Sequence, residues 1–382
     1  MNVVIGLTPH SIFWVCIVSS IFIVLLVLIS QNTKLISGIP MHLTVAVFAI
    51  VATRLIVPVE FLKINKTYVL YDIAPTIYEI LTHKIGTLKG YDINILNILY
   101  FIWFTVSAIL LVIYIIENIK LCRNIKLTPY ATTKEQNVLK KLKEKFDCRF
   151  NVKLIVSEAV SSPSEYGYFT HTIFLNKANY TDEELEFILT HELFHYKYGT
   201  QWLKLLSELI WILFWWNPII YIYKELLAAR IEIYVDSKVT KKMTSHQIKS
   251  YLKTIFKAYY ECDNKNVIIL PLVGSFANQN EKNLKQRFEL LSKSNKVNIP
   301  MCLYIMLITS VYLFISCRYI IQPGWQPEES ELQDNSFADF EGENSYILFE
   351  NGQYTLYFNG EPFAEVKEED IEKFSNVPVY NK

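Results

Sequence analysis

Two histidines spaced four residues apart, with a glutamate directly after the first, are the residues of this chain best suited to metal chemistry. They lie in the segment His191-Glu192-Leu193-Phe194-His195. Residues i and i+4 of a helix share one face, so both imidazoles can ligate the same zinc ion. Glu192 would then stand beside the metal as a general base. The spacing therefore predicts a zinc site that hydrolyses a bond with an activated water molecule.

The residues before this segment predict the helix that the two histidines need. Thr181 and Glu184 have the spacing of a capping box, in which each side chain bonds the backbone N–H of the other residue. Leu185, Ile188 and Leu189 follow as an apolar stripe. We expect a single helix that runs from this cap through both histidines.

A zinc site with two histidines needs a further protein ligand, and a later acidic pair supplies a candidate. Glu232 is preferred because Asp236, one helical turn on, can hydrogen-bond a ligating imidazole. Glu225 is the competing ligand, but no acidic residue follows it at that spacing. A charged helix face exposed to water is the structural alternative. The predicted metal ligands are thus His191, His195 and Glu232, with Glu192 as catalytic base and Zn2+ as cofactor.

The composition indicates a membrane protein. Hydrophobic residues make up 52% of the chain and charged residues only 19%, with no net charge. Four apolar runs, at residues 12–30, 42–59, 95–116 and 299–316, are each close to the length needed to cross the hydrocarbon core. We therefore expect four transmembrane helices.

Lysine and arginine gather after the third apolar run and before the fourth. By the positive-inside rule, the segment between them is cytoplasmic. The predicted organisation is three transmembrane helices in residues 1–117 with an extracellular loop at about 60–93, a cytoplasmic zinc metallopeptidase domain in 118–298, a fourth transmembrane helix in 299–318, and an acidic extracellular tail in 319–382. This describes a multi-pass cell-membrane protein whose N-terminus and C-terminal tail are extracellular.

The cytoplasmic segment has an α+β pattern. Residues 133–146 predict a basic amphipathic helix, and residues 152–156 and 172–175 predict two strands. If the second strand lies at a sheet edge, it can hold an extended peptide by backbone pairing; an ordinary sheet strand is the alternative. The aromatic stretch at about 203–223 predicts a membrane-associated hairpin, because a full span there would separate Glu232 from His191 by the membrane.

The tail alternates short apolar runs with two Asn-Gly pairs, Asn351-Gly352 and Asn359-Gly360. This pattern is typical of tight hairpins and predicts a small antiparallel meander. The meander could bind an extracellular ligand or partner, or be a passive cap. The predicted fold class is a multi-pass α-helical membrane protein with a cytoplasmic α+β gluzincin-like metallopeptidase domain and a small extracellular β-meander tail.

Taken together, these residues resemble the BlaR/MecR-type membrane zinc metallopeptidases, bacterial sensor-transducers that provoke removal of a transcriptional repressor. The resemblance covers about residues 1–300. Its marks are residues 54–61, Ser162-Pro163 with Gly167, residues 172–175, Glu183-Glu184-Leu185 before His191, the element Trp215-Trp216-Asn217-Pro218, and Glu232 with Asp236. It implies zinc at His191, His195 and Glu232, deprotonation of the attacking water by Glu192, and a cytoplasmic repressor protein as substrate.

The chain departs from the family pattern at three places. Thr200 stands where an acidic residue is usual, and Asn176 stands where proline is common. About 60 residues follow the last apolar run, without the Ser-x-x-Lys nucleophile of a penicillin-binding sensor domain. The resemblance therefore implies signal transduction, but not β-lactam sensing.

Other readings remain open at this level. Residues 279–296 resemble a region where such transducers cut themselves, although a plain helical linker also fits. The same fold could work as a non-catalytic membrane receptor or as a quality-control protease. No glycine-rich phosphate loop or basic-aromatic surface indicates direct nucleic-acid binding. Membrane lipid is an expected partner, and a homodimer is left open.

Overall fold

The structure is a computed structural model of the 382-residue chain. It describes residues 5–6, 9–32, 36, 38–58, 60–61, 66–70, 80–81, 83–88, 91–127, 131–157, 160, 162–260, 281–292, 297–323, 345–350, 353–358, 361–366 and 377–381. The chain divides into two compact units, residues 1–68 with 84–322 and residues 69–83 with 323–382. Each unit is described by itself below.

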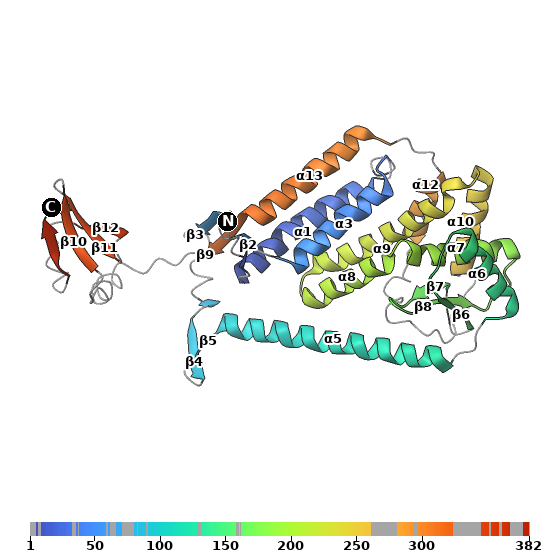
Figure 1. The fold of residues 1–382 in the computed structure, drawn as a ribbon, viewed down its shortest axis with the longest axis horizontal. Coiled ribbons are helices and arrows are strands. Elements are labelled where there is room, and N and C mark those ends of the chain that lie inside the picture. Colours follow the sequence, from blue (N-terminus) through green and yellow to red (C-terminus); the bar gives the residue numbers. More distant parts are fainter. Residues whose placement is uncertain are drawn as a thin grey trace. The chain divides into compact units, whose positions relative to one another are not determined.

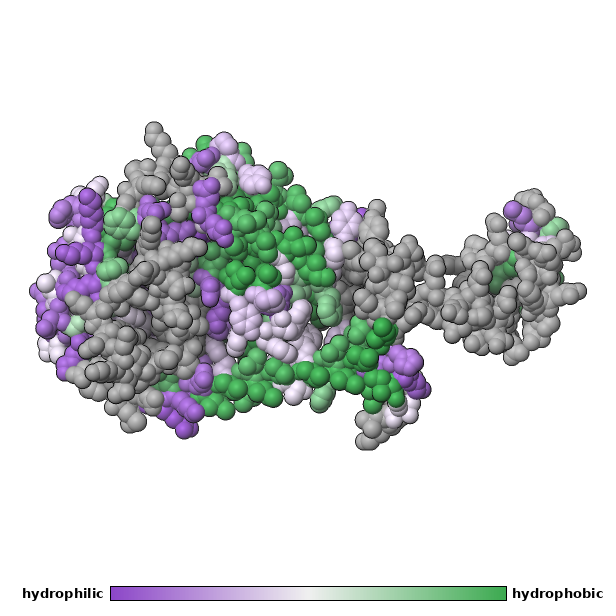
Figure 2. All heavy atoms as spheres, turned by 180° about the vertical axis from the view of Figure 1, so that it is seen from behind, coloured by the Kyte–Doolittle hydropathy of each residue, from purple (hydrophilic) through white to green (hydrophobic). Residues whose placement is uncertain are grey.

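Four apolar helices appear where the sequence predicts spans: α1 (Pro9–Gln31), α3 (Met41–Ile56), α5 (Ile95–Leu127) and α13 (Ile299–Arg318). By length and composition, α1, α5 and α13 can cross a membrane. Helix α3 has 16 residues, or about 24 Å at 1.5 Å per residue. It is therefore shorter than the predicted span, so three of the four predicted spans are present as helices long and apolar enough to cross a membrane. Hydrophobic surface gathers over the long helices of this unit (Figure 2).

Short strands accompany these helices. Strand β1 (Ile5–Gly6) pairs antiparallel with β2 (Glu60–Phe61), and β4 (Lys84–Leu88) pairs antiparallel with β5 (Tyr91–Asn94). Strand β3 (Lys66–Leu70) lies within the predicted loop, and strand β9 (Tyr319–Pro323) directly follows α13. The predicted outer loop thus contains β-structure where it is described.

The expected α+β domain is built around a three-stranded sheet. Strand β6 (Val152–Ser157) lies parallel to β8 (His171–Asn176), and β7 (Ser164–Tyr166) lies antiparallel to it, in the order β6-β8-β7. The sequence pattern predicted the two strands β6 and β8 but not β7. Strand β8 contains residues 172–175 and is central, so of the two alternatives for this segment the structure supports the ordinary sheet strand. Among the described strands, β7 and β6 form the edges of this sheet.

Two helices cover the sheet. The amphipathic helix α6 (Thr133–Lys145) buries Leu139 and Leu142, as its apolar spacing predicts. Helix α7 (Asp182–Lys197) carries both histidines and begins at the predicted capping box of Thr181 and Glu184. It buries its apolar stripe against β8, so the sheet and the cap fix the rotation of the helix.

After α7 the chain reverses and forms the hairpin of α8 (Thr200–Leu213) and α9 (Pro218–Val239). Gly199 starts the reversal with φ 66°, a left-handed conformation that glycine adopts without strain. At the tip, the Asn217 side chain caps α9 by accepting from the N–H of Ile219 and donates to Ser20 of α1. Tyr223 then donates to the carbonyl of Phe48 in α3 at 2.8 Å. The hairpin is therefore fastened to the apolar helices (Figure 1).

The remaining helices of this unit, α10 and α12, pack against α7 and α9. A 3-10 turn, η1 (Thr240–Lys242), leads to α10 (Ser245–Tyr260), and α12 (Glu281–Ser292) precedes α13. Helix α12 confirms the predicted helical character of the linker before the last apolar helix. Side chains of α7, α9 and α10 share one buried cluster that includes Phe194, Val235 and Tyr251. This cluster packs the helices around the segment that bears the histidines.

The second unit contains a four-stranded sheet. Strands β10 (Ser345–Glu350), β11 (Gln353–Phe358) and β12 (Glu361–Val366) pair antiparallel in sequence order. A fourth strand, β13 (Val379–Asn381), runs parallel to β10, so the sheet is larger than the predicted meander. The two Asn-Gly pairs lie outside the described residues. Ile347 and Leu356 form the centre of its small core.

Candidate metal centre

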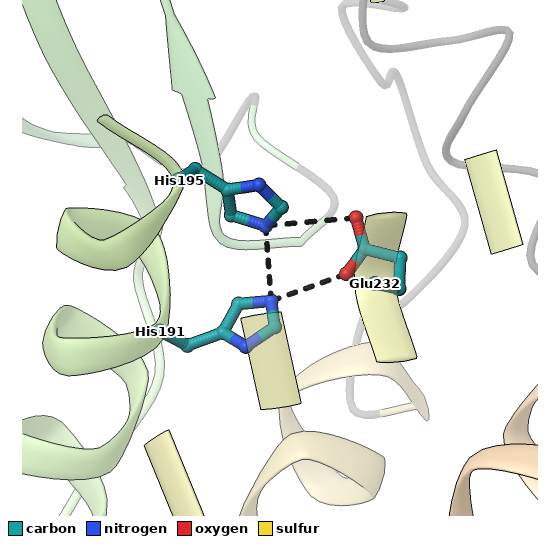
Figure 3. A group of neighbouring side chains, drawn as sticks. All are labelled: His191, His195 and Glu232. Atoms are coloured by element: carbon teal, nitrogen blue, oxygen red, sulfur yellow. Dashed lines mark hydrogen bonds and ion pairs between the residues drawn. The ribbon is translucent and has the colours of Figure 1, made fainter. Parts of the chain in front are cut away.

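Three side chains from two helices meet below the sheet (Figure 3). His191 and His195 lie one turn apart on α7, and their Nε2 atoms are 3.2 Å apart. Glu232 of α9 places Oε2 3.1 Å from Nε2 of His191 and Oε1 3.6 Å from Nε2 of His195. Both imidazoles are buried. The three possible ligand atoms therefore converge on one point between α7 and α9.

Hydroxyl groups hold the far nitrogen of each imidazole. Tyr251 donates to Asp236 at 2.6 Å, so its oxygen can accept from Nδ1–H of His191 at 2.8 Å. Thr200 donates to the carbonyl of His195 at 3.2 Å and can accept from Nδ1–H of that ring at 2.8 Å. With the proton on Nδ1, the lone pair of each ring lies on Nε2. In this tautomer each ring can present Nε2 as a ligand to the convergence point.

Asp236 anchors one side of this arrangement. Its side chain has no solvent exposure, and it accepts from Nε and Nη2 of Arg287 at 2.6 and 2.8 Å. Oδ1 of Asp236 also lies 3.2 Å from Nδ1 of His191. Burial would raise the pKa of Asp236, but Arg287 and His191 lower it to about 2. Asp236 is therefore a carboxylate that helps to orient His191.

A second buried ion pair, between Lys204 and Glu165, lies on the His195 side of the centre. Nζ of Lys204 on α8 lies 2.5 Å from Oε1 of Glu165 on β7 and 3.7 Å from Oε1 of Glu232. Glu165 approaches Nδ1 of His195 at 3.6 Å. Burial alone would lower the pKa of Lys204, yet Glu165 and Glu232 raise it. This pair connects the edge strand β7 with the two helices that meet at the centre.

Glu192 lies between the two histidines in the sequence and is buried beside them. Its Oε2 atom has no hydrogen-bond partner in the described structure, which is unusual for a buried carboxyl group. Burial, partly offset by His191, raises the pKa of Glu192 well above its ordinary value. A carboxylate with a raised pKa is a better proton acceptor, which suits a general base.

The charges of the cluster test whether a divalent cation fits. Among the described residues, four buried carboxyl groups face two cationic side chains, which leaves a net charge of −2 if every carboxyl is ionised. The carboxyl groups are those of Glu165, Glu192, Glu232 and Asp236, and the cationic side chains are Lys204 and Arg287. A buried cluster is stable only when its charges are compensated, and one divalent ion would make this cluster neutral.

The spacing of the ligand atoms also fits zinc. Bonds of about 2.0–2.1 Å in a tetrahedron place neighbouring ligand atoms about 3.3 Å apart. Nε2 of His191 lies 3.1 Å from Oε2 of Glu232 and 3.2 Å from Nε2 of His195, and Nε2 of His195 lies 3.6 Å from the other oxygen of Glu232. Two imidazoles and one carboxylate form the ligand set of many hydrolytic zinc centres. Geometry, donor type and charge are thus all compatible with Zn2+.

The structure brings together all five residues that the sequence singled out. Glu225, the competing ligand, is exposed on α9 and lies outside the cluster. Sequence reasoning missed Tyr251, Glu165 and Lys204, because single polar residues on other elements give no spacing signal. It noted Thr200 only as a departure from the family pattern, although the hydroxyl has a clear partner in His195.

The fold and the site define the class of protein: a largely helical membrane protein with a metallopeptidase-type centre on its interior helices. The family model described as BlaR1 peptidase M56 matches residues 11–291, which is more than half of the chain. The chain belongs to this peptidase family. The family resemblance noted in the sequence is thereby confirmed.

Curated relatives are similar at low identity. The chain is 22% identical to the methicillin resistance mecR1 protein of Staphylococcus aureus strain Mu50 over 280 residues, covering 70% of this chain and 48% of that protein. It is 26% identical to the regulatory protein BlaR1 of Bacillus licheniformis over 161 residues, covering 41% and 26%. For the BlaR1 protein of Staphylococcus aureus the identity is 22% over 259 residues, covering 63% and 43%. The chain spans about half the length or less of these relatives.

Proposed function

We propose that this protein is a membrane zinc endopeptidase that transduces a signal by hydrolysing a peptide bond in a cytoplasmic repressor, in itself, or in both. The observation that carries the proposal is the convergence of His191, His195 and Glu232 beside the buried carboxyl group of Glu192. Family membership and the names of the relatives, which include regulatory proteins, support the same reading.

Each residue of the centre has a defined task in this proposal. His191, His195 and Glu232 would hold zinc, which when bound supplies a Lewis acid for the scissile carbonyl. Glu192 accepts a proton from the attacking water and passes it to the leaving amine. Tyr251 and Thr200 hold the two imidazoles in the tautomer that keeps Nε2 free for the metal. Burial of the cluster strengthens the electrostatic interactions of each group.

The proposal includes the membrane topology expected from the sequence. The peptidase segment, residues 118–298, lies in the cytoplasm, and the N-terminus and the tail lie outside. The hairpin at about 203–223, formed by α8 and the start of α9, is associated with the membrane, and the contacts of Asn217 and Tyr223 with α1 and α3 support this. A cytoplasmic substrate such as a repressor is then on the same side as the metal centre.

Cleavage of a co-expressed winged-helix repressor tests this function. The wild-type chain is compared with Glu192→Gln, which removes the base but keeps the shape of the side chain and every proposed metal ligand. We expect a repressor fragment from wild type only, loss of the fragment with a chelator, and recovery on adding zinc. Equal zinc content and no fragment from either chain would favour the non-catalytic receptor. Fragments from unfolded membrane proteins, but not from the repressor, would favour quality control.

A further inference from the structure

Helix α12 contributes a residue to the metal centre although it lies next to the last apolar helix. Arg287 is buried and makes two short contacts with Asp236, through Nε at 2.6 Å and Nη2 at 2.8 Å. Nη1 of Arg287 lies 3.8 Å from Oε2 of Glu232. The planar guanidinium fork therefore fixes the carboxylate that orients His191 and also faces a proposed metal ligand.

Loss of this contact would change the metal centre directly. Asp236 has no exposure to solvent, so removal of Arg287 leaves a buried carboxylate without its main cationic partner. Asp236 would keep only its contacts with Tyr251 and His191, and a shift of its carboxylate toward other partners would move these two side chains as well. The ring that presents Nε2 would lose its fixed orientation.

The same helix is fastened to the apolar helices. Gln286, next to Arg287, donates to the carbonyl of Ser30 near the end of α1 at 3.1 Å and accepts from Arg230 of α9 at 3.4 Å. Leu290 belongs to the buried cluster of the apolar helices, whereas Leu291 packs against the cluster around α7 and α10. Helix α12 therefore contacts both cores within two turns.

The connection from α12 to α13 is short. Helix α12 ends at Ser292 and α13 begins at Ile299, and Asn298 donates its N–H to the carbonyl of Gly38 at 2.8 Å. A Cβ atom added at Gly38 would lie 2.6 Å from Cβ of Asn298. A side chain at position 38 therefore forces Gly38 and Asn298, the residue before α13, apart.

We propose that α12 is a latch in which Arg287 positions Asp236 and His191 and couples the metal centre to the arrangement of α1 and α13. This inference rests on the proposed zinc site. It adds that the positions of the apolar helices affect the zinc affinity of that site through α12. Arg287 acts through Asp236 and is a positioning residue. A displacement of α13 changes the hold of Arg287 and hence the affinity for zinc.

A double-mutant cycle on zinc affinity tests the latch. Zinc binding to the full chain in detergent is measured by competition with a chromophoric chelator, for wild type, Gly38→Ala, Arg287→Ala and the double variant. We expect Arg287→Ala to weaken zinc binding about 10–100-fold, the usual effect of losing a group that orients a ligand. Gly38→Ala should weaken it about 3-fold or more when Arg287 is present and have no further effect when Arg287 is absent.

Matched variants act as controls. Gly86→Ala adds the same methyl group where nothing lies within 4 Å, and it should leave zinc affinity unchanged. Arg287→Lys keeps the charge but not the fork, so it should recover only part of the affinity. If Gly38→Ala does not give monodisperse protein, Gln286→Ala replaces it in the cycle, with Glu289→Gln on the same helix as its control.

The outcomes separate the latch from the zinc site itself. A wild-type chain that binds no zinc would overturn both proposals. A wild-type chain that binds zinc while Gly38→Ala has the same effect with and without Arg287, or none at all, would overturn the latch alone. Full recovery by Arg287→Lys would contradict the role of the two-pronged contact with Asp236.

Discussion

At the scale of single residues, the Nδ1 atoms of the two imidazoles matter for metal binding as much as the Nε2 atoms that would ligate the metal. Tyr251 and Thr200 each bind an Nδ1 atom at 2.8 Å and so decide which nitrogen faces the metal position. Burial raises the pKa of Tyr251 well above its ordinary value, so this residue stays a neutral hydroxyl. The two hydroxyls thus orient both rings so that Nε2 faces the proposed metal position.

Removal of the Tyr251 hydroxyl should loosen the site without removing a ligand. Tyr251→Phe keeps the buried ring but breaks the bridge between His191 and Asp236. We expect zinc affinity to fall about 10-fold or more. The measurement is chelator competition, with Tyr304→Phe on α13, outside the cluster, as control. An unchanged affinity for Tyr251→Phe would show that Asp236 alone orients His191.

Zinc binding should release protons, because protons and metal compete for the same charges. Burial opposes a charged His191, yet Asp236 and Glu232 raise its pKa to about 10. His191 is therefore protonated near neutral pH when no metal is bound, and the raised pKa of Glu192 favours its protonated form as well. A divalent ion would take over the charge compensation that these protons supply.

Because the pKa values of His191 and Glu192 are raised, zinc affinity should increase as the pH rises. Zinc must displace the proton of His191, so apparent affinity rises with pH up to about 10, by up to about 10-fold per pH unit for each proton released. Calorimetry in two buffers with different ionisation enthalpies counts the protons, and we expect between one and two. Binding without proton release near neutral pH would contradict the charge balance.

At the scale of elements, α7 is the part that the sequence predicts most completely. The capping box, the apolar stripe and the two histidines all follow one helical period, so local spacing determines the start and the buried face of the helix. Strand β7 could not be predicted in the same way, because its three residues are too few for a periodic signal. Glu165 lies on β7, and Lys204 of α8 forms its ion pair with Glu165. Neither role could therefore be predicted without this strand.

The cap of α7 should contribute measurably to stability. Thr181→Ala removes the acceptor for the N–H of Glu184 and should cost about 1 kcal/mol. Thr181→Ser keeps the hydroxyl and is the control. The midpoint of thermal unfolding in detergent, compared at equal zinc saturation, measures the effect. Equal midpoints for wild type and Thr181→Ala would mean that packing against β8 alone holds the helix start.

At the scale of the whole molecule, α9 joins the metal centre to the apolar helices. Its first half contacts α1 and α3 through Asn217 and Tyr223, and its second half carries Glu232 and Asp236. The spans and the site could each be predicted from the sequence. Their connection through α8, α9 and α12 could not, because it depends on contacts between residues far apart in the chain.

The proposed topology predicts which residues can be labelled from outside the cell. Lys140 on α6 and Gln353 on β11 are both exposed. In a chain whose native cysteines are replaced by alanine, Gln353→Cys should react with a membrane-impermeant maleimide in intact cells. Lys140→Cys should react only after the cells are opened. The reverse pattern would place the peptidase segment outside the membrane.

The most direct test of the central claim is the zinc content of the purified full chain, measured for wild type, His191→Ala, Glu232→Gln and Glu225→Gln. We expect about one zinc ion per chain in wild type and Glu225→Gln, as a single three-ligand site predicts, and loss of zinc in the other two. Zinc retained in Glu232→Gln but lost in Glu225→Gln would contradict the ligand set. Absence of zinc from the wild-type chain would contradict the metal centre altogether.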